Sequence, residues 1–315
     1  MRIRDKVKKP QRPVVAYEIL PPREKDGTLN SYAETISSLL SQTHIDAINI
    51  PEVHDEIGRG DRPITNQKRG EPREFGMLLQ DIVGIEAIIN RVVVHESYDE
   101  QIRWIDETNT TYEIENMIIV GGESSKVDYP GPSVNEMLQT IARRYNSNGG
   151  DIFCGGIAIP SRKDESKNLI RKSEHGSEFF TTQVLYNAEN IIKMINNYQS
   201  RCNELDTFPR RILLSFAPVS SQKNIEFLKW LGVEIPDDTE RYLKGRPGSM
   251  TERSLDVAVE VLNEVLDFIT VNNLKVPVGL NVEHIMSYNF QSSVEMLQEL
   301  ARIYREFCIK TQQYS

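Results

Sequence analysis

Residues 14–23 read VVAYEILPPR, and this stretch decides the fold class. The run 14–20 is mostly apolar, with Glu18 as its charged residue, a composition typical of a strand buried in a sheet. Pro21 and Pro22 then stop the run, because proline has no N–H to donate to a neighbouring strand. Runs of this kind that alternate with helices indicate a parallel sheet.

Seven further runs follow the first. The predicted strands span 14–20, 46–50, 91–95, 116–120, 152–159, 179–185, 211–216 and 276–281. Segments with the period of amphipathic helices lie between or after them, at 30–41, 133–145, 188–202, 251–269 and 293–308. Eight strand–helix units predict a closed (β/α)8 TIM barrel, which commonly forms one domain of about 250 residues or more. An open doubly wound sheet is the alternative, but it usually has fewer strands.

We expect a single barrel domain over residues 13–315. Residues 1–12 carry many basic side chains and no long apolar run, and we expect a flexible, solvated tail there. Segment 234–250 is rich in proline, glycine and charge, which predicts an insertion with a short extra helix or lid. Residues 75–90 are largely apolar, so the helix boundary in the third unit stays open.

Composition excludes several function classes. The chain has 315 residues, 39% of them hydrophobic, and a formal net charge of −9, which disfavours nucleic acid and anionic membranes as partners. No apolar run approaches the roughly 20 residues that span a bilayer. Cys154, Cys202 and Cys308 form no CxxC pair, so we expect no disulfide framework and no zinc site, and the cytoplasm is the default compartment. Monomer and homo-oligomer both stay open.

The active site of such barrels lies at the carboxyl ends of the strands. Polar and acidic residues stand at the predicted ends, namely Glu18, Asn49, Glu52, His54, His95, Glu96, Gly121, Gly122, Glu123, Arg162, Gln183, Ser220, Asn281, Glu283 and His284. We expect these residues to converge on one rim. Carboxylates and imidazoles can bind divalent ions, but the spacing is irregular, and a solvated charged loop is the simpler interpretation. We therefore predict no metal.

Glu18 is the leading catalytic candidate, because burial in an apolar strand raises a carboxyl pKa and favours proton donation. The alternative is a structural ion pair with Arg23 or Arg162. Gly121 and Gly122 would let a flat ligand or a phosphate approach the backbone, although a tight turn explains them as well. No GxGxxG or Walker sequence is present, so nothing supports a Rossmann nucleotide site.

The order of these pieces resembles one known family. Residues 17–23, YEILPPR, resemble the E-F-F-P-P-R sequence that opens the barrel of methylenetetrahydrofolate reductases. Further similar pieces follow in order: His95, the run 120–123 (family L-R-G-D), Glu165 to Gly176 (D-x-x-N-x-x-R-K…G), Thr182-Gln183 (T-Q), 217–220 (L-P-V-S), 233–236 (V-x-I-P) and Leu280-Asn281 (L-N). Each piece is short, but their order covers nearly the whole chain.

The resemblance implies a flavin-dependent oxidoreductase acting on a CH–NH bond in one-carbon and methionine metabolism. In that family NADH or NADPH reduces FAD, and the hydride then passes to 5,10-methylenetetrahydrofolate, which becomes the methyl form. Glu18 would protonate the leaving nitrogen, and Glu123 would orient pterin and flavin. The implied cofactor contacts are His95, Gly121, Gly122, Arg162, Glu165, Asn168, Arg171 and Lys172, and the implied folate or pterin contacts are Gln183, Asn224, Leu228 and Asn281.

Several positions depart from the family pattern. Compared with the family, Gly121 and Val282 replace arginines, Glu123 an aspartate, Leu228 a phenylalanine and Asn224 a glutamine. A second hypothesis follows, in which a divergent, flavin-independent barrel binds a folate or pterin one-carbon carrier, for direct hydride transfer, methyl transfer or as a complex subunit. A metal-dependent lyase ranks third.

Overall fold

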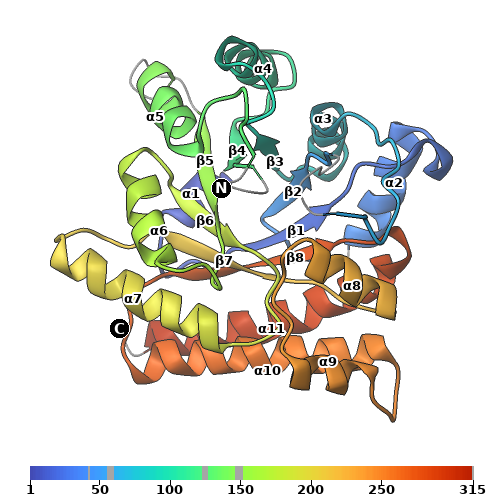
Figure 1. The fold of residues 1–315 in the computed structure, drawn as a ribbon, viewed down its shortest axis with the longest axis vertical. Helices are drawn as coiled ribbons and strands as arrows, with labels where there is room; N and C mark the ends of the chain where they lie inside the picture. The colour runs from blue at the N-terminus through green and yellow to red at the C-terminus, as the bar shows by residue number, and fades with distance from the viewer. Residues whose placement is uncertain (42, 55–59, 123–126, 146–151, 314–315) are drawn as a thin grey trace.

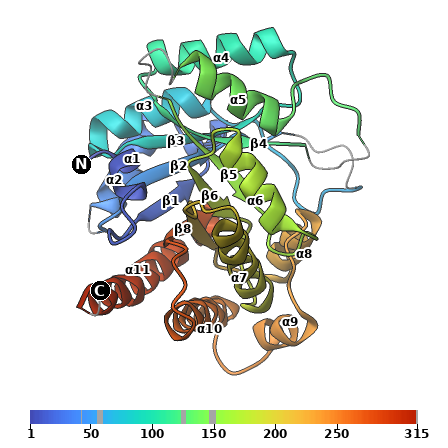
Figure 2. The same ribbon diagram turned by 90° about the vertical axis from the view of Figure 1, so that its left-hand side faces the viewer.

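Eight parallel strands form a closed barrel with helices around it (Figures 1 and 2). The structure is a computed structural model, and it describes all residues except 42, 55–59, 123–126, 146–151 and 314–315. Each strand pairs with its sequence neighbour, and β8 closes the barrel against β1. The predicted (β/α)8 barrel is confirmed.

The strands are short and the outer helices longer. The strands are β1 Val15–Ile19, β2 Ala47–Pro51, β3 Ala87–Val92, β4 Asn116–Val120, β5 Phe153–Ala158, β6 Phe179–Thr182, β7 Arg211–Phe216 and β8 Val278–His284. The helices are α1 Ile3–Val7, α2 Leu29–Leu40, α3 Pro72–Val83, α4 Tyr98–Thr110, α5 Val134–Arg144, α6 Glu165–Glu174, α7 Glu189–Glu204, α8 Gln222–Trp230, α9 Asp237–Lys244, α10 Met250–Val271 and α11 Phe290–Gln313. Helix α9 lies inside the segment 234–250, where an extra helix was expected.

Two strands differ from the prediction in ways that change the site. Strand β3 ends at Val92, so the predicted strand 91–95 was placed too late. The physical cause is Gly84, whose φ of 71° ends α3 and lets the strand begin soon afterwards. Strand β8 continues to His284, whereas the prediction ended it at Asn281. Glu283 is therefore part of the barrel wall and not of a loop.

Alternate residues of each strand point into the barrel, which sorts the interior into two layers. The lower layer is apolar, and it includes Ala16, Ala47, Ile88, Ile118, Phe153, Phe179 and Leu213. Two positions further along most of these strands, the same faces carry Glu18, Asn49, Asn90, Thr181 and Ser215. The period of two thus places polar side chains at the carboxyl ends, above a hydrophobic floor.

Helix α1 closes the lower end of the barrel, so the solvated tail predicted for residues 1–12 is wrong. Ile3 and Val7 are buried in the same cluster as the lower layer. Buried Arg211 on β7 donates from Nε to the Val7 carbonyl at 3.1 Å and from Nη2 to the Lys9 carbonyl at 2.6 Å. Ile3 and Val7 are one helical turn apart, and the residues between them are charged. Burial of these two side chains against the barrel stabilises a helix that is too short to form alone.

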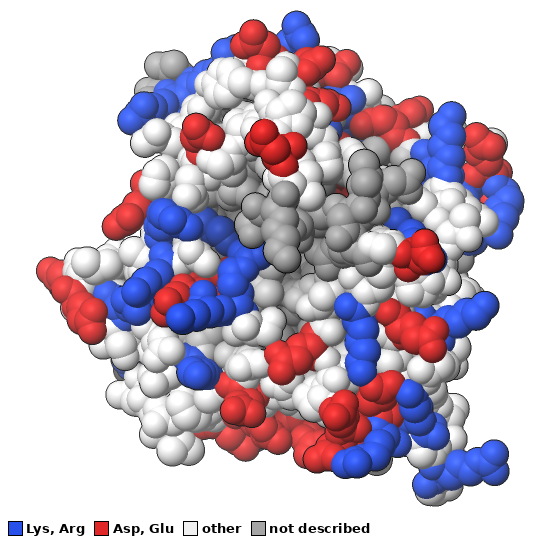
Figure 3. Space-filling model, in the orientation of Figure 1, with Lys and Arg blue, Asp and Glu red and all other residues white. Residues whose placement is uncertain are grey.

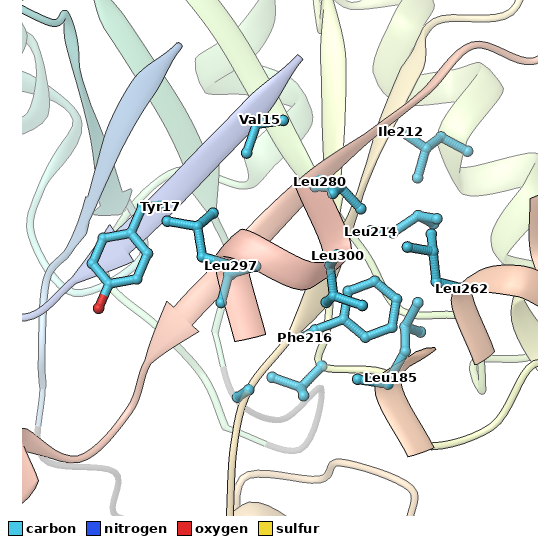
Figure 4. Packing of buried hydrophobic residues seen from close by; sticks show 14 of the residues in the cluster. Val15, Tyr17, Leu185, Ile212, Leu214, Phe216, Leu262, Leu280, Leu297 and Leu300 are labelled. Carbon is cyan, nitrogen blue, oxygen red and sulfur yellow. The ribbon is translucent and has the colours of Figure 1, made fainter. Parts of the chain in front are cut away.

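The outward-facing strand residues pack beneath the surrounding helices. Figure 4 shows Val15, Tyr17 and Leu280 of the barrel beside Leu297 and Leu300 of α11. This larger cluster holds the strands in place and so fixes the directions of the inward-facing polar groups. Among the described residues, no helix has the length and apolar character to cross a lipid bilayer.

Candidate active site

A cavity of about 580 Å³ opens at the carboxyl ends of the strands. This volume is within the usual range for small-molecule sites. Eight residues predicted for the site line it: Glu18, His95, Gly121, Gly122, Arg162, Lys172, Gln183 and Leu228. Residues from six different strands and their following loops therefore meet at one mouth. Glu123 lies outside the described residues.

Glu18 sits in the polar layer of the wall and faces this cavity. Its Oε2 accepts a hydrogen bond of 2.6 Å from Asn49 Nδ2 on β2. Burial raises the pKa of Glu18 from the ordinary 4.5 to about 7, although hydrogen bonds from Asn281 and Asn90 oppose the rise. A carboxyl that titrates near neutrality can hold a proton and release it at physiological pH. The geometry thus suits an acid catalyst.

Glu283 is a second carboxyl at the mouth, where it was expected, but it lies on the strand itself and not beyond its end. It lies on β8 in register with Glu18 on β1, and it also lines the cavity. Burial and the nearby charge of Glu18 raise the pKa of Glu283 well above the ordinary value. The period-two pattern Gly279, Asn281, Glu283 could have placed Glu283 on the strand, because it continues the inward face past the predicted strand end.

A group of charged residues lies at the β5–α6 side of the mouth. Glu165 is buried and accepts hydrogen bonds from Asn168 Nδ2 at 2.8 Å and from the Ile159 N–H at 3.1 Å. Its carboxylate also lies 3.5 Å from Lys172 Nζ and 3.7 Å from an Arg162 nitrogen. Glu165 therefore fixes two cations that line the cavity, and Lys and Arg side chains gather on the surface over α6 (Figure 3).

Arg162 and Lys172 are suited to an anionic ligand such as a diphosphate, since both present cationic donors to the cavity. Glu165, Asn168 and Arg171 do not line it. They act behind the wall, where Arg171 donates to Asn168 Oδ1 at 2.9 Å. The predicted cofactor contacts in this region thus divide into two cations at the cavity and three residues that support them.

The paired glycines have different surroundings. A Cβ atom at Gly122 would overlap the ring of Tyr129, so the missing side chain makes room for that tyrosine. A Cβ at Gly121 would lie 3.1 Å from Val134 Cγ2. Close packing of the protein itself therefore explains Gly122. His95 lies in the turn after β3, with ring centroids 4.9 Å from His54 and 5.5 Å from Tyr129.

Of the four predicted substrate contacts, two line the cavity and two do not. Gln183 and Leu228 line the cavity, and Gln183 Nε2 donates to the Leu231 carbonyl at 3.0 Å. Asn281 lies below the mouth and donates to Ser215 Oγ at 3.1 Å. Asn224 is buried outside the cavity wall, and its Oδ1 accepts from the Ser220 N–H at 3.0 Å and from Asn289 Nδ2 at 3.2 Å.

Sequence reasoning missed the inward amide Asn90. Asn90 lies on β3 and lines the cavity. The predicted strand began only at residue 91, so Asn90 fell in the region where the helix boundary was left open. Val282, one of the departures from the family pattern, is buried in the outer core and so is not part of the cavity wall. Within the described part of the chain, no cluster of three or more His, Cys, Asp or Glu residues could hold a metal ion.

Similarity to known proteins agrees with this arrangement. The model of the methylenetetrahydrofolate reductase family matches residues 2–297. The chain belongs to this family. Methylenetetrahydrofolate reductase 1 of Schizosaccharomyces pombe is 25% identical over 177 residues, which cover 52% of this chain and 26% of that protein. The chain therefore matches about a quarter of the relative's length.

A solved structure from Clostridium thermocellum shares the fold of this family member. It superposes with a TM-score of 0.76 at 22% identity, and covers 96% of this chain and 99% of the other. That protein is described as uncharacterized, and it binds two copies of 5-methyl-5,6,7,8-tetrahydrofolic acid.

Proposed function

We propose that this member of the methylenetetrahydrofolate reductase family is a flavin-dependent reductase. Its substrate would be a methylene-pterin, 5,10-methylenetetrahydrofolate or a related one-carbon carrier, with NADH or NADPH as the hydride donor. The observation that carries the proposal is Glu18, a carboxyl with a pKa of about 7 at a cavity that also contains Gln183 and two cations.

In this proposal Glu18 is the acid. Opening the five-membered ring of a methylene-pterin breaks a C–N bond, and the nitrogen that keeps the electron pair needs a proton. Glu18 supplies it, while the side chain of Gln183, tethered through Leu231, binds the pterin edge. Leu228 and its apolar neighbours exclude water from the reacting carbon.

FAD would supply the hydride relay when bound. The residues that suit it are Arg162 and Lys172, because two cations can neutralise a diphosphate, and Glu165 holds both in position. Gly121 and Gly122 line the same cavity. The test is a visible spectrum of the protein purified without added cofactor, before and after NADH or NADPH. Yellow protein that bleaches supports the proposal; colourless protein that gains no flavin on reconstitution contradicts it.

A second candidate is a flavin-free barrel that binds a folate one-carbon carrier. Tyr129 favours it, because its ring takes the space that Gly122 leaves open. The Clostridium thermocellum protein, which binds two copies of 5-methyl-5,6,7,8-tetrahydrofolic acid, gives a precedent for folate binding on this fold. Calorimetric titration with 5-methyltetrahydrofolate separates the two candidates. Binding without flavin, with a stoichiometry of two, favours the carrier, whereas one folate beside bound flavin favours the reductase.

A further inference from the structure

Two carboxyl groups stand side by side on the adjacent strands β1 and β8. Glu18 and Glu283 are register partners on adjacent parallel strands, which lie about 4.8 Å apart. Both are inward positions of the period-two pattern and both line the cavity. Their side chains therefore leave the wall at the same height and in the same direction. If both were ionised, two like charges would stand side by side in a half-buried site.

The hydrogen-bond partners around the two carboxyls are neutral. Asn49 Nδ2 donates to Glu18 at 2.6 Å, and Asn281 Nδ2 lies 3.4 Å from Glu283 Oε1. Ser215 on β7 also reaches Glu283. These groups can stabilise one negative charge by hydrogen bonding, but they cannot neutralise two.

The charged and titratable groups at the same mouth have partners of their own. Lys172 is bound to Glu165 and to the Ile157 carbonyl. Arg91 on β3 pairs with Glu52 at 2.6 Å. Within the described residues, neither Lys172 nor Arg91 forms an ion pair with Glu18 or Glu283.

Two further groups complete the surroundings of Glu283. Tyr186 is close enough for the charge of Glu283 to raise its pKa, and its hydroxyl donates to the Ala217 carbonyl at 2.8 Å. His284 follows Glu283 on β8, and its ring packs edge-on against Phe290, with centroids 5.2 Å apart. The raised pKa keeps Tyr186 neutral, so it adds no cation to the pair.

Unsatisfied acceptors give an independent indication. The side-chain oxygens of Asn49, Asn90 and Asn281 are buried and accept no hydrogen bond in the described structure. Together with the carboxyl oxygens, they make a region rich in acceptors and poor in donors. One proton on the pair converts a carboxylate oxygen into an O–H donor, and an amide oxygen can accept its hydrogen bond. A retained proton thus relieves both the like-charge contact and the shortage of donors.

We propose that Glu18 and Glu283 share one proton at neutral pH, and that Glu283 is a positioning residue that keeps Glu18 in its acid form. Its use in catalysis rests on the proposed reductase function. When Glu18 acts, its O–H bond breaks, an N–H bond forms on the leaving nitrogen, and that nitrogen keeps the electron pair of the broken C–N bond. The pair then carries two negative charges until it takes a proton from water.

The proton can be observed without flavin or substrate. Infrared spectra of the ligand-free protein, taken in H2O and D2O from pH 5 to 10, report the C=O stretch of a protonated carboxyl. We expect wild-type protein to keep such a band above pH 8, and the Glu283→Gln variant to lose it at a pH lower by about one unit or more. The Glu52→Gln variant is the matched control, because ionised Glu52 should contribute no band.

Each infrared outcome decides the inference by itself. A wild-type protein without a protonated carboxyl at pH 8 overturns it, and this measurement needs no variant to fold. A band that titrates at the same pH in wild type and Glu283→Gln overturns it as well. Because neither measurement needs a cofactor, protein that fails to bind flavin would refute the proposed function and leave this inference intact.

Kinetics test the role of Glu283 in the reaction. In Glu283→Gln, the basic limb of the kcat/KM profile should move to lower pH, while KM at low pH stays close to that of wild type. Glu283→Asp restores a carboxyl and should move the limb back towards the wild-type position. A uniform loss of activity at every pH, with the limb unmoved, would show that Glu283 only supports the fold.

Discussion

Replacing Glu18 with glutamine should stabilise the protein at neutral and alkaline pH. In the unfolded chain this carboxyl ionises near 4.5, whereas the folded barrel raises its pKa to about 7. The folded state therefore binds the extra proton between these values, and the wild-type free energy of unfolding falls as the pH rises through this window. Below pH 4.5 the carboxyl is protonated in both states, so this contribution to stability is then fully present.

The size of the effect follows from the pKa. At about 1.36 kcal/mol per pH unit, the rise from 4.5 to about 7 corresponds to about 3 kcal/mol. This is an upper bound, because the cavity lets water reach the carboxyl. Glutamine keeps the shape and cannot ionise. The Glu18→Gln variant should therefore gain up to this amount over wild type at pH 8, and much less at pH 5.

Urea unfolding of both proteins at pH 5, 6, 7 and 8 gives the difference directly. The matched control is Glu52→Gln, for which the sign reverses. Burial alone would raise the pKa of Glu52, but hydrogen bonds from His54 and Val92 and the charge of Arg91 lower it. Glu52 therefore stabilises the fold above its unfolded pKa. A Glu18→Gln difference that is equal at pH 5 and pH 8 would refute the reasoning.

Three further predictions concern the walls and the floor of the barrel. Lys172→Met should weaken flavin binding about tenfold or more, measured by fluorescence titration, since it removes a charge-assisted contact; an unchanged Kd would exclude the lysine as a ligand. Arg211→Met should lower the free energy of unfolding by about 3 kcal/mol, because the carbonyls of Val7, Lys9 and Pro10 lose their donor. Gly155→Ala should cost about 1–3 kcal/mol in urea unfolding, since its Cβ would lie 2.6 Å from the Phe179 ring.

The sequence predicts most of the barrel because strand and helix signals agree there. Strands β4 and β7 have the predicted bounds, since each is a short apolar run that begins at a polar residue and is followed closely by glycine or proline. Strand β3 does not, because apolar residues continue on both sides of it and only Gly84 marks where α3 ends. Helix α1 was not predicted for another reason. It has only five residues, and two apolar side chains among three charged ones give no clear helical pattern.

The site was predictable where it depended on strand ends. Glu18, Gln183 and Arg162 meet at one cavity, as the barrel topology requires. Glu283 was expected at the rim, but beyond the end of its strand, and Asn90 was not expected there, because a shift of a few residues in a strand boundary decides whether a side chain belongs to the wall or to a loop. Asn224 shows the opposite error, because it was predicted to bind the substrate but lies outside the cavity wall. Its side chain instead forms hydrogen bonds with Ser220 and Asn289 that hold the neighbouring loops.

The bond between Arg211 and the Val7 carbonyl joins positions 204 residues apart. On the ribosome, residues 3–7 emerge before all eight strands, yet the surface that receives them is complete only after β7 has been translated. Helix α1 therefore remains undocked through most of synthesis, and it should dock among the last events of folding. A bulky group introduced beside Ile3 would therefore stand next to this late step and hinder it.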